Sequence, residues 1–197
     1  MNHNCEKNCN FASNFIFSSM SIVKIIDKTF KTSFSEEQIR QRVKELGQQI
    51  SKDMEGKNPL LLGVLNGSFI FAADLLREIT IPCEISFVKL ASYEGILSTG
   101  KVKEVMGLNE DISGRTVIIV EDIVDTGRTM RQMLDSLRVR HPGSIHICTL
   151  FLKPDKLEKP LDIDYAAFSI PNEFIVGYGL DYDQQGRGLK EIYTLVE

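Results

Sequence analysis

Three acidic residues lie within five positions at the end of an apolar, β-branched run. Residues 116–120 read Thr-Val-Ile-Ile-Val, and Glu121, Asp122 and Asp125 follow them. A run of this composition predicts a strand that is buried on both faces of a sheet. Acids packed at its carboxyl end repel one another, so such a cluster is best tolerated where ligand hydroxyls or a metal ion use it. The cluster therefore predicts a binding site.

The segment directly after the acids has the composition of a phosphate-binding turn. Residues 126–129 read Thr-Gly-Arg-Thr, and apolar residues follow at positions 130, 133, 134 and 137, which is helical spacing. Small residues, hydroxyls and free backbone N–H groups at a helix start are how proteins hold a phosphate. Acids and phosphate turn together predict a sugar phosphate as ligand. A solvated acidic turn would not require this order of strand, paired acids, hydroxyls and amphipathic helix.

The same segment has a competing interpretation. Residues 124–127 read Val-Asp-Thr-Gly, which matches the core motif of aspartic proteases. Those enzymes pair two such loops, because their chemistry needs two aspartates that share a proton. This chain has one Asp-Thr-Gly, and a helical pattern follows it. The strand-loop-helix context therefore disfavours a protease.

Bulk properties indicate one folded domain of ordinary composition. The chain has 197 residues, of which 43% are hydrophobic and 25% charged, and its net charge is −4. That length supports one α/β domain with a substantial core. The acidic balance argues against a broad nucleic-acid-binding face, and no apolar run is long enough to cross a bilayer.

The cysteines favour free thiols over a metal site or disulfides. Cys5 and Cys9 lie near His3, but no second ligand pair follows at zinc-finger spacing, and Cys83 and Cys148 are isolated. We expect free thiols in a reducing cytosol.

Strand and helix patterns alternate along the chain, which predicts a mostly parallel sheet flanked by helices, with ligands at the carboxyl ends of the strands. Ser35 and Gln38 form a capping box, and apolar residues at 39, 43, 46, 50 and 54 mark one face of the helix that follows. Residues 1–20 are Asn-rich and irregular, so we expect a disordered or extraneous extension before a domain at 21–197. The other expected elements are strands at 22–31, 60–65, 83–91 and 144–152, a helix at 69–79, and short strands and turns over 165–196.

Residues 117–130 resemble the signature of the phosphoribosyltransferases that use phosphoribosyl pyrophosphate (PRPP). The resemblance to the hypoxanthine and hypoxanthine-guanine branch extends from about Ile22 to the C-terminus. It implies the type I phosphoribosyltransferase fold, an α/β fold with a small hood subdomain. It also implies that Glu121 and Asp122 hold the ribose hydroxyls, and that Asp125 is the catalytic residue facing purine N7. The implied 5′-phosphate loop is Asp125, Thr126, Gly127, Arg128 and Thr129.

Two further segments take roles through this resemblance alone. Asn66 and Gly67 would form the pyrophosphate loop, with a cis peptide bond between Leu65 and Asn66. Many relatives have a lysine where Asn66 stands, so pyrophosphate binding by this loop would rely more on backbone donors and Mg²⁺. Ser92 and Tyr93 would belong to a lid, which protects PRPP from water. Without the resemblance, the first segment would be either an ordinary turn or an anion-binding nest of backbone N–H groups, and the second would be a plain loop.

The resemblance also implies a base pocket and a metal site. Lys153 would donate to the purine 6-oxo group, Phe174 would stack on the ring, and the Ile175 backbone would read its edge. Asp181 would border the base and hold Mg²⁺, and Arg187 would clamp pyrophosphate. Taken alone, Lys153 would be a solvated strand end and Phe174 a core residue. The implied Mg²⁺ ligands are Glu121, Asp122 and Asp181.

The implied function is purine salvage. The 5-phosphoribosyl group of PRPP would pass to hypoxanthine, with guanine as a second base, giving IMP or GMP and pyrophosphate. Two alternatives stay open: another base such as xanthine, and an RNA-binding regulator on the same fold. The acidic charge balance argues against the regulator, and salt-dependent RNA affinity would favour it. The resemblance further implies a cytoplasmic homodimer or homotetramer with small-molecule substrates, and no nucleic-acid or membrane partner.

Overall fold

A six-stranded sheet forms the centre of the computed structural model, which describes residues 21–90 and 105–196. Five strands run parallel, and β5 pairs antiparallel with β4 at one edge. The expected mostly parallel sheet is thereby confirmed. The expected extension (1–20) and the lid residues Ser92 and Tyr93 lie outside the described residues. In spatial order the strands are β5 (Val105–Met106), β4 (Glu84–Leu90), β3 (Leu60–Val64), β6 (Thr116–Val124), β7 (Ser144–Leu152) and β8 (Tyr165–Ser169).

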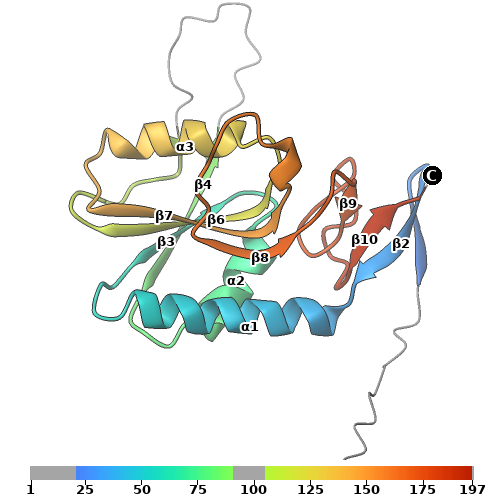
Figure 1. The fold of residues 1–197 in the computed structure, drawn as a ribbon, viewed down its shortest axis with the longest axis horizontal. Helices are drawn as coiled ribbons and strands as arrows, with labels where there is room; N and C mark the ends of the chain where they lie inside the picture. Colours follow the sequence, from blue (N-terminus) through green and yellow to red (C-terminus); the bar gives the residue numbers. More distant parts are fainter. Residues whose placement is uncertain (1–20, 91–104, 197) are drawn as a thin grey trace, which may run out of the picture.

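Helices cover both faces of this sheet (Figure 1). On one face lie α1 (Glu36–Asp53) and α2 (Phe69–Glu78), and on the other lies α3 (Arg128–Arg138). Each face has its own apolar cluster, one with the buried side chains of α1 and α2 and one with those of α3. The capping box at the start of α1 is confirmed, because Ser35 and Gln38 each accept the other's backbone N–H. None of the described helices is long and apolar enough to cross a membrane.

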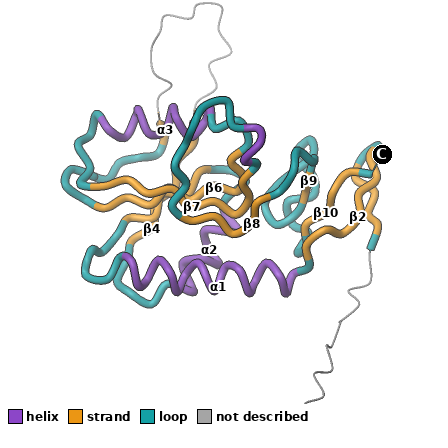
Figure 2. Tube along the Cα trace, viewed as in Figure 1, coloured by secondary structure: helices purple, strands orange, loops and turns teal. Residues whose placement is uncertain are grey.

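A second, antiparallel sheet of four strands stands beside the first, beyond the amino end of α1 (Figure 2). It is the hood subdomain, and it joins strands from distant parts of the chain. One expectation was wrong here: residues 22–31 are a hairpin and not one strand, with Ile26 at a left-handed φ of 56°. The two-residue turn is Ile26-Asp27, in which Asp27 is the one turn-favouring residue and Ile26 is unusual at a left-handed φ, so the turn signal in the sequence is weak. The hood strands are β1 (Ile22–Ile25), β2 (Lys28–Phe34), β10 (Ile192–Leu195) and β9 (Ile175–Val176).

The central strand β6 is longer than its apolar run. The sequence predicts a strand over 116–120, yet β6 continues to Val124 and includes both Glu121 and Asp122. The ladder with β7 explains this, because Glu121 pairs with Thr149 and Val124 with Leu152. Backbone pairing thus carries the acids to the carboxyl edge of the sheet.

The contact between α1 and α2 depends on a glycine. A Cβ added at Gly47 would lie 2.5 Å from Glu78 Cβ and 2.9 Å from Glu78 O. We expect Gly47→Ala to lower the free energy of unfolding by about 1–3 kcal/mol through overpacking, although alanine favours helices. Denaturant unfolding measures the change. The exposed Gln48 on the same helix is the control, and Gln48→Ala should stay within about 0.5 kcal/mol. A Gly47→Ala protein as stable as the unmodified one would contradict this close packing.

Candidate active site

The acid pair of β6 consists of a buried Glu121 and a half-buried Asp122. The positive charge of Arg187 lowers the pKa of Asp122 but does not offset the effect of burial on it. Glu121 is 7% exposed, and its Oε2 has no hydrogen-bond partner among the described residues. Burial raises the pKa of Glu121 well above its usual value, and the adjacent charge of Asp122 raises it further. Burial likewise raises the pKa of Asp122, although its Oδ1 accepts the Ile123 N–H at 2.8 Å. Buried acids of this kind are typical of a site whose ligand or metal ion completes the polar contacts.

The turn between β3 and α2 is pressed against this pair. The Leu65–Asn66 peptide bond is cis, as expected. A Cβ added at Gly67 would lie 1.5 Å from Asp122 Oδ2, so this position admits glycine alone. From the hood side, Gly179 approaches so closely that its added Cβ would lie 2.0 Å from Gly67 O. The turn is therefore enclosed between an acid of β6 and a loop that precedes β10.

The loop from β6 to α3 forms a small cavity of about 290 Å³. Gly127 begins α3 with a left-handed φ of 74°, and no side chain caps the helix. The free N–H groups of the first turn are thus available to a phosphate. The cavity is lined by residues 121–127, Thr129 and Met130.

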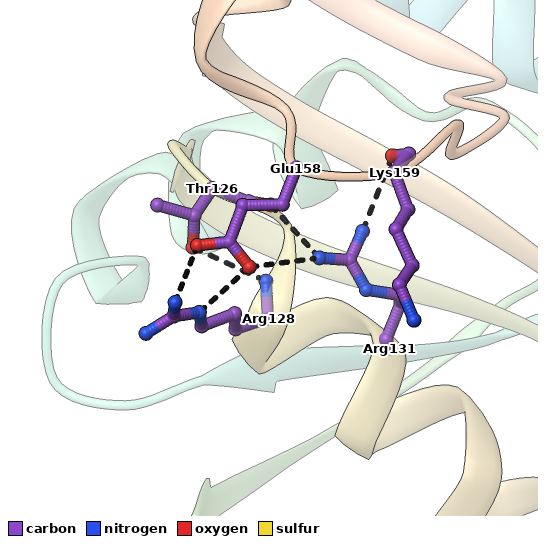
Figure 3. Close-up of polar contacts among 5 residues, drawn as sticks. All are labelled: Thr126, Arg128, Arg131, Glu158 and Lys159. Carbon is purple, nitrogen blue, oxygen red and sulfur yellow. Dashed lines mark hydrogen bonds and ion pairs between the residues drawn. The ribbon is translucent and has the colours of Figure 1, made fainter.

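Arg128 contributes to this loop differently from its neighbours. Its backbone N–H donates to Thr126 Oγ1 at 3.3 Å, but its guanidinium points to Glu158 (Figure 3). Arg128 Nε lies 2.7 Å from one carboxylate oxygen and Nη2 lies 2.6 Å from the other. Arg128 is therefore not among the residues that line the cavity: its guanidinium is bound to Glu158 and its N–H to Thr126.

A second cavity of about 240 Å³ adjoins the first, and Asp125 lines both. The four residues that the sequence assigned to base binding all line it, namely Lys153, Phe174, Ile175 and Asp181. Lys153 is 6% exposed, with Nζ 3.4 Å from Asp125 Oδ2, so it is not a solvated strand end. Phe174 is 46% exposed and is therefore no core residue.

Sequence reasoning missed Lys156. Its Nζ lies 3.1 Å from the Asp125 oxygen that Lys153 also faces, because the turn Pro154–Lys156 folds the chain back. The proline after Lys153 signals such a turn, but no motif marks the second lysine. Asp125 Oδ1, in contrast, is buried and has no partner among the described residues. The carboxylate therefore faces two cations with one oxygen and keeps the other free.

The hood loop brings Asp181 and Arg187 together. Their side chains form an ion pair of 2.6 Å, and Arg187 Nη1 donates to Gly179 O at 2.7 Å. Arg187 is thereby fixed beside the turn that contains Gly67. No three His, Cys, Asp or Glu side chains within residues 21–90 and 105–196 converge as a metal site, so Glu121, Asp122 and Asp181 do not form one by themselves.

Residues 34–183 match the family model described as the phosphoribosyl transferase domain. The chain belongs to the phosphoribosyltransferase family. It is 45% identical over 168 residues to the hypoxanthine-guanine phosphoribosyltransferase of Streptococcus mutans, covering 85% of this chain and 93% of the relative. It is 47% identical over 171 residues to the hypoxanthine phosphoribosyltransferase of Buchnera aphidicola, covering 85% of this chain and 97% of the relative.

Solved structures show the same likeness in three dimensions. A crystal structure of a hypoxanthine-guanine phosphoribosyltransferase from Bacillus anthracis superposes with a TM-score of 0.78 at 38% identity, covering 90% of this chain and 99% of that one. The type I phosphoribosyltransferase fold and the resemblance read from residues 117–130 are confirmed.

The raised pKa values of the acid pair predict that ionisation of these acids lowers the free energy of unfolding at neutral pH. A folded-state pKa above the unfolded value means that the unfolded chain loses its proton first, so stability falls as pH rises from the unfolded pKa toward the folded one. Glu121→Gln removes one titrating group. We expect it to raise the free energy of unfolding at pH 7 by about 0.5–2 kcal/mol. The gain should fade below about pH 4, where the unfolded carboxyl also keeps its proton.

Denaturant unfolding at pH 4 and pH 7, without added metal, measures this difference. Glu55→Gln on the exposed turn after α1 is the control and should show no such pH dependence. A gain of equal size at both pH values would mean that ionisation of Glu121 is not its cause.

Proposed function

We propose that this phosphoribosyltransferase transfers the 5-phosphoribosyl group of PRPP to hypoxanthine, with guanine as a second base. The observation that carries the proposal is the pair of adjoining cavities that share Asp125, one bordered by an acid pair and an uncapped helix start, the other by a buried lysine. Sugar phosphate and base would then meet at one carboxylate. The relatives named above are hypoxanthine or hypoxanthine-guanine enzymes, which supports the choice of base.

In the base cavity, the donors and acceptors suit a 6-oxopurine. Lys153, which is donor-only when charged, would donate to the 6-oxo oxygen. Asp125 Oδ1, which has no partner among the described residues, would accept the proton at purine N7. Phe174, whose ring is exposed, would stack on the base, and the Ile175 backbone would read its edge.

On the sugar side, the residues would bind and orient PRPP for displacement at the anomeric carbon. Glu121 and Asp122 would hold the ribose hydroxyls and favour the positive charge of an oxocarbenium-like state. Residues 125–129 would bind the 5′-phosphate through the amino end of α3. The main chain at Asn66 and Gly67, together with Arg187, would hold the leaving pyrophosphate. Ser92 and Tyr93 would cover the reacting groups.

The acid set fits Mg²⁺ as cofactor. The unpartnered Glu121 Oε2 and the raised pKa of both acids call for a cation, and Asn66 supplies none. Mg²⁺ binds through one or two carboxylates and substrate oxygens, so the lack of a complete protein cage in the described residues suits it. Glu121, Asp122 and Asp181 would hold the ion, which neutralises pyrophosphate charge when bound.

Two features suggest the setting in which the enzyme works. Cys83 and Cys148 are free thiols, which supports a reducing cytoplasm.

Large apolar side chains are exposed on the end of β3, the start of α2 and β4. A second copy of the chain would find an apolar surface there, in a homodimer or homotetramer. These side chains are Leu65, Phe69 and Phe87.

The proposal is tested by PRPP-dependent turnover of a panel of free bases. Hypoxanthine and guanine should react with Mg²⁺ present, adenine should not, and excess EDTA should abolish turnover until Mg²⁺ is restored. Turnover of xanthine alone would assign a different base. Full activity in EDTA would contradict the metal assignment, and no turnover of any base would overturn the proposed reaction.

Lys153→Met tests how the base is chosen. The variant keeps much of the side-chain length and deletes the donor, so kcat/KM for hypoxanthine should fall by roughly 10–100-fold, as for a lost hydrogen bond to a charged group. KM for PRPP should change little, and the ratio of kcat/KM for hypoxanthine to kcat/KM for adenine should decrease. Lys156→Met is the control, because Lys156 faces the same Asp125 oxygen but does not line the base cavity. An unaltered base profile in Lys153→Met would remove Lys153 from this role.

A further inference from the structure

Two loops that serve different parts of the reaction meet at one carbonyl oxygen. The phosphate loop comprises residues 125–129, and the base loop comprises residues 153–161, which begin with Lys153. The oxygen of Thr126, in the phosphate loop, accepts the Glu158 N–H of the base loop at 3.3 Å. The same oxygen accepts a hydrogen bond from Arg131 Nη2 at 3.0 Å (Figure 3). The junction of the loops thus includes a side chain that belongs to neither.

Arg131 binds the main chain of both loops. It projects from the first turn of α3, and its Nη1 donates to Lys159 O in the base loop at 3.2 Å. Its Nη2 also lies 3.9 Å from the Glu158 carboxylate, and the side chain is only 24% exposed. Space for the guanidinium depends on Gly127, where an added Cβ would lie 3.0 Å from Arg131 Nη1. One planar group therefore joins the two carbonyls, a geometry that guanidinium provides and a single ammonium does not.

Arg128 makes a contrasting contact with the same acid. Its side chain is 71% exposed and binds the Glu158 carboxylate, not the main chain of the base loop. An exposed ion pair of this kind contributes little to stability, because solvent screens it. Arg138, in the last turn of α3, likewise makes an exposed ion pair, with Asp135 at 3.5 Å, and it lies outside both loops. Arg138 is therefore the control for the loss of one arginine charge from this helix.

We propose that Arg131 is a positioning residue that holds the phosphate loop against the base loop. Binding of the sugar phosphate at residues 125–129 then also restricts the segment that carries Lys153, and binding of the base restricts the phosphate loop. Such coupling is reciprocal by thermodynamic necessity. The expected effect of Arg131 on the reaction rests on the proposed function. Its expected effect on the affinity of the phosphate loop requires only that this loop binds a sugar phosphate.

The test compares Arg131→Gln, Arg131→Lys and Arg138→Gln in the full-length enzyme. Arg131→Gln should raise KM for PRPP and KM for hypoxanthine by roughly 5–20-fold, the loss expected for a charged hydrogen bond. Its kcat at saturation should stay within about twofold, because the residue acts on binding and not on the reacting atoms. Arg131→Lys should show KM values between those of the unmodified enzyme and those of Arg131→Gln, and Arg138→Gln should leave both KM values within about twofold.

Calorimetric titration with ribose 5-phosphate separates this role from the proposed reaction. The affinity for ribose 5-phosphate should fall in Arg131→Gln and not in Arg138→Gln, whether or not the enzyme accepts hypoxanthine. Equal losses in the two variants, or an unchanged affinity in a folded Arg131→Gln, would overturn the positioning role. If Arg131→Gln does not fold, Arg131→Lys carries the test, because it keeps the stem and the charge. Failure of the unmodified enzyme to turn over hypoxanthine would overturn only the proposed function.

Discussion

Glu121 and Asp122 lie side by side at the end of β6, and this pairing sets the main constraint on the structure. The charge of Arg187 favours the ionised form of Asp122, but burial outweighs it. Burial raises the pKa of Glu121 and of Asp122, so keeping both ionised costs free energy. The surrounding fold must supply that energy, and it does so with a central strand whose residues 117–120 are fully buried and with helices on both faces. The site thus lies where the scaffold is most stable, at the carboxyl edge of the middle of the sheet.

Close backbone approach links this acid pair to the hood. The Asp122 carboxylate lies against Gly67, and the Gly67 main chain lies against Gly179, so three segments from distant parts of the sequence meet where neither glycine has room for a side chain. Arg187 joins this contact because it donates a hydrogen bond to Gly179 O, and Asp181 is held there by its ion pair with Arg187. The position of the turn that contains Asn66 and Gly67 is therefore fixed by close contacts with the Asp122 carboxylate and with the main chain at Gly179.

Local patterns predicted much of the scaffold, because their causes are local. The capping box at Ser35 needs only residues three positions apart, and the amphipathic spacing after Met130 marks α3 by itself. The continuation of β6 through its acids could not be read in this way, since it depends on pairing with β7. Lys156 and Arg131 were missed for a related reason. Their partners, Asp125 and the carbonyls of Thr126 and Lys159, are brought close only by the fold of the base loop.

The hood is assembled from both ends of the described chain, and this imposes an order on biosynthesis. Strand β2 pairs with β1 in a local hairpin on one side and with β10 on the other, with Phe30 opposite Leu195, so its second neighbour is synthesised only near the end of the described chain. The central sheet, the acid pair and the phosphate loop are all translated before Phe174, Asp181 and Arg187. All residues that line the first cavity can therefore emerge from the ribosome before Phe174, Ile175, Leu180 and Asp181, which line the second. Premature termination within β10 would leave the edge of β2 exposed to pairing with other chains.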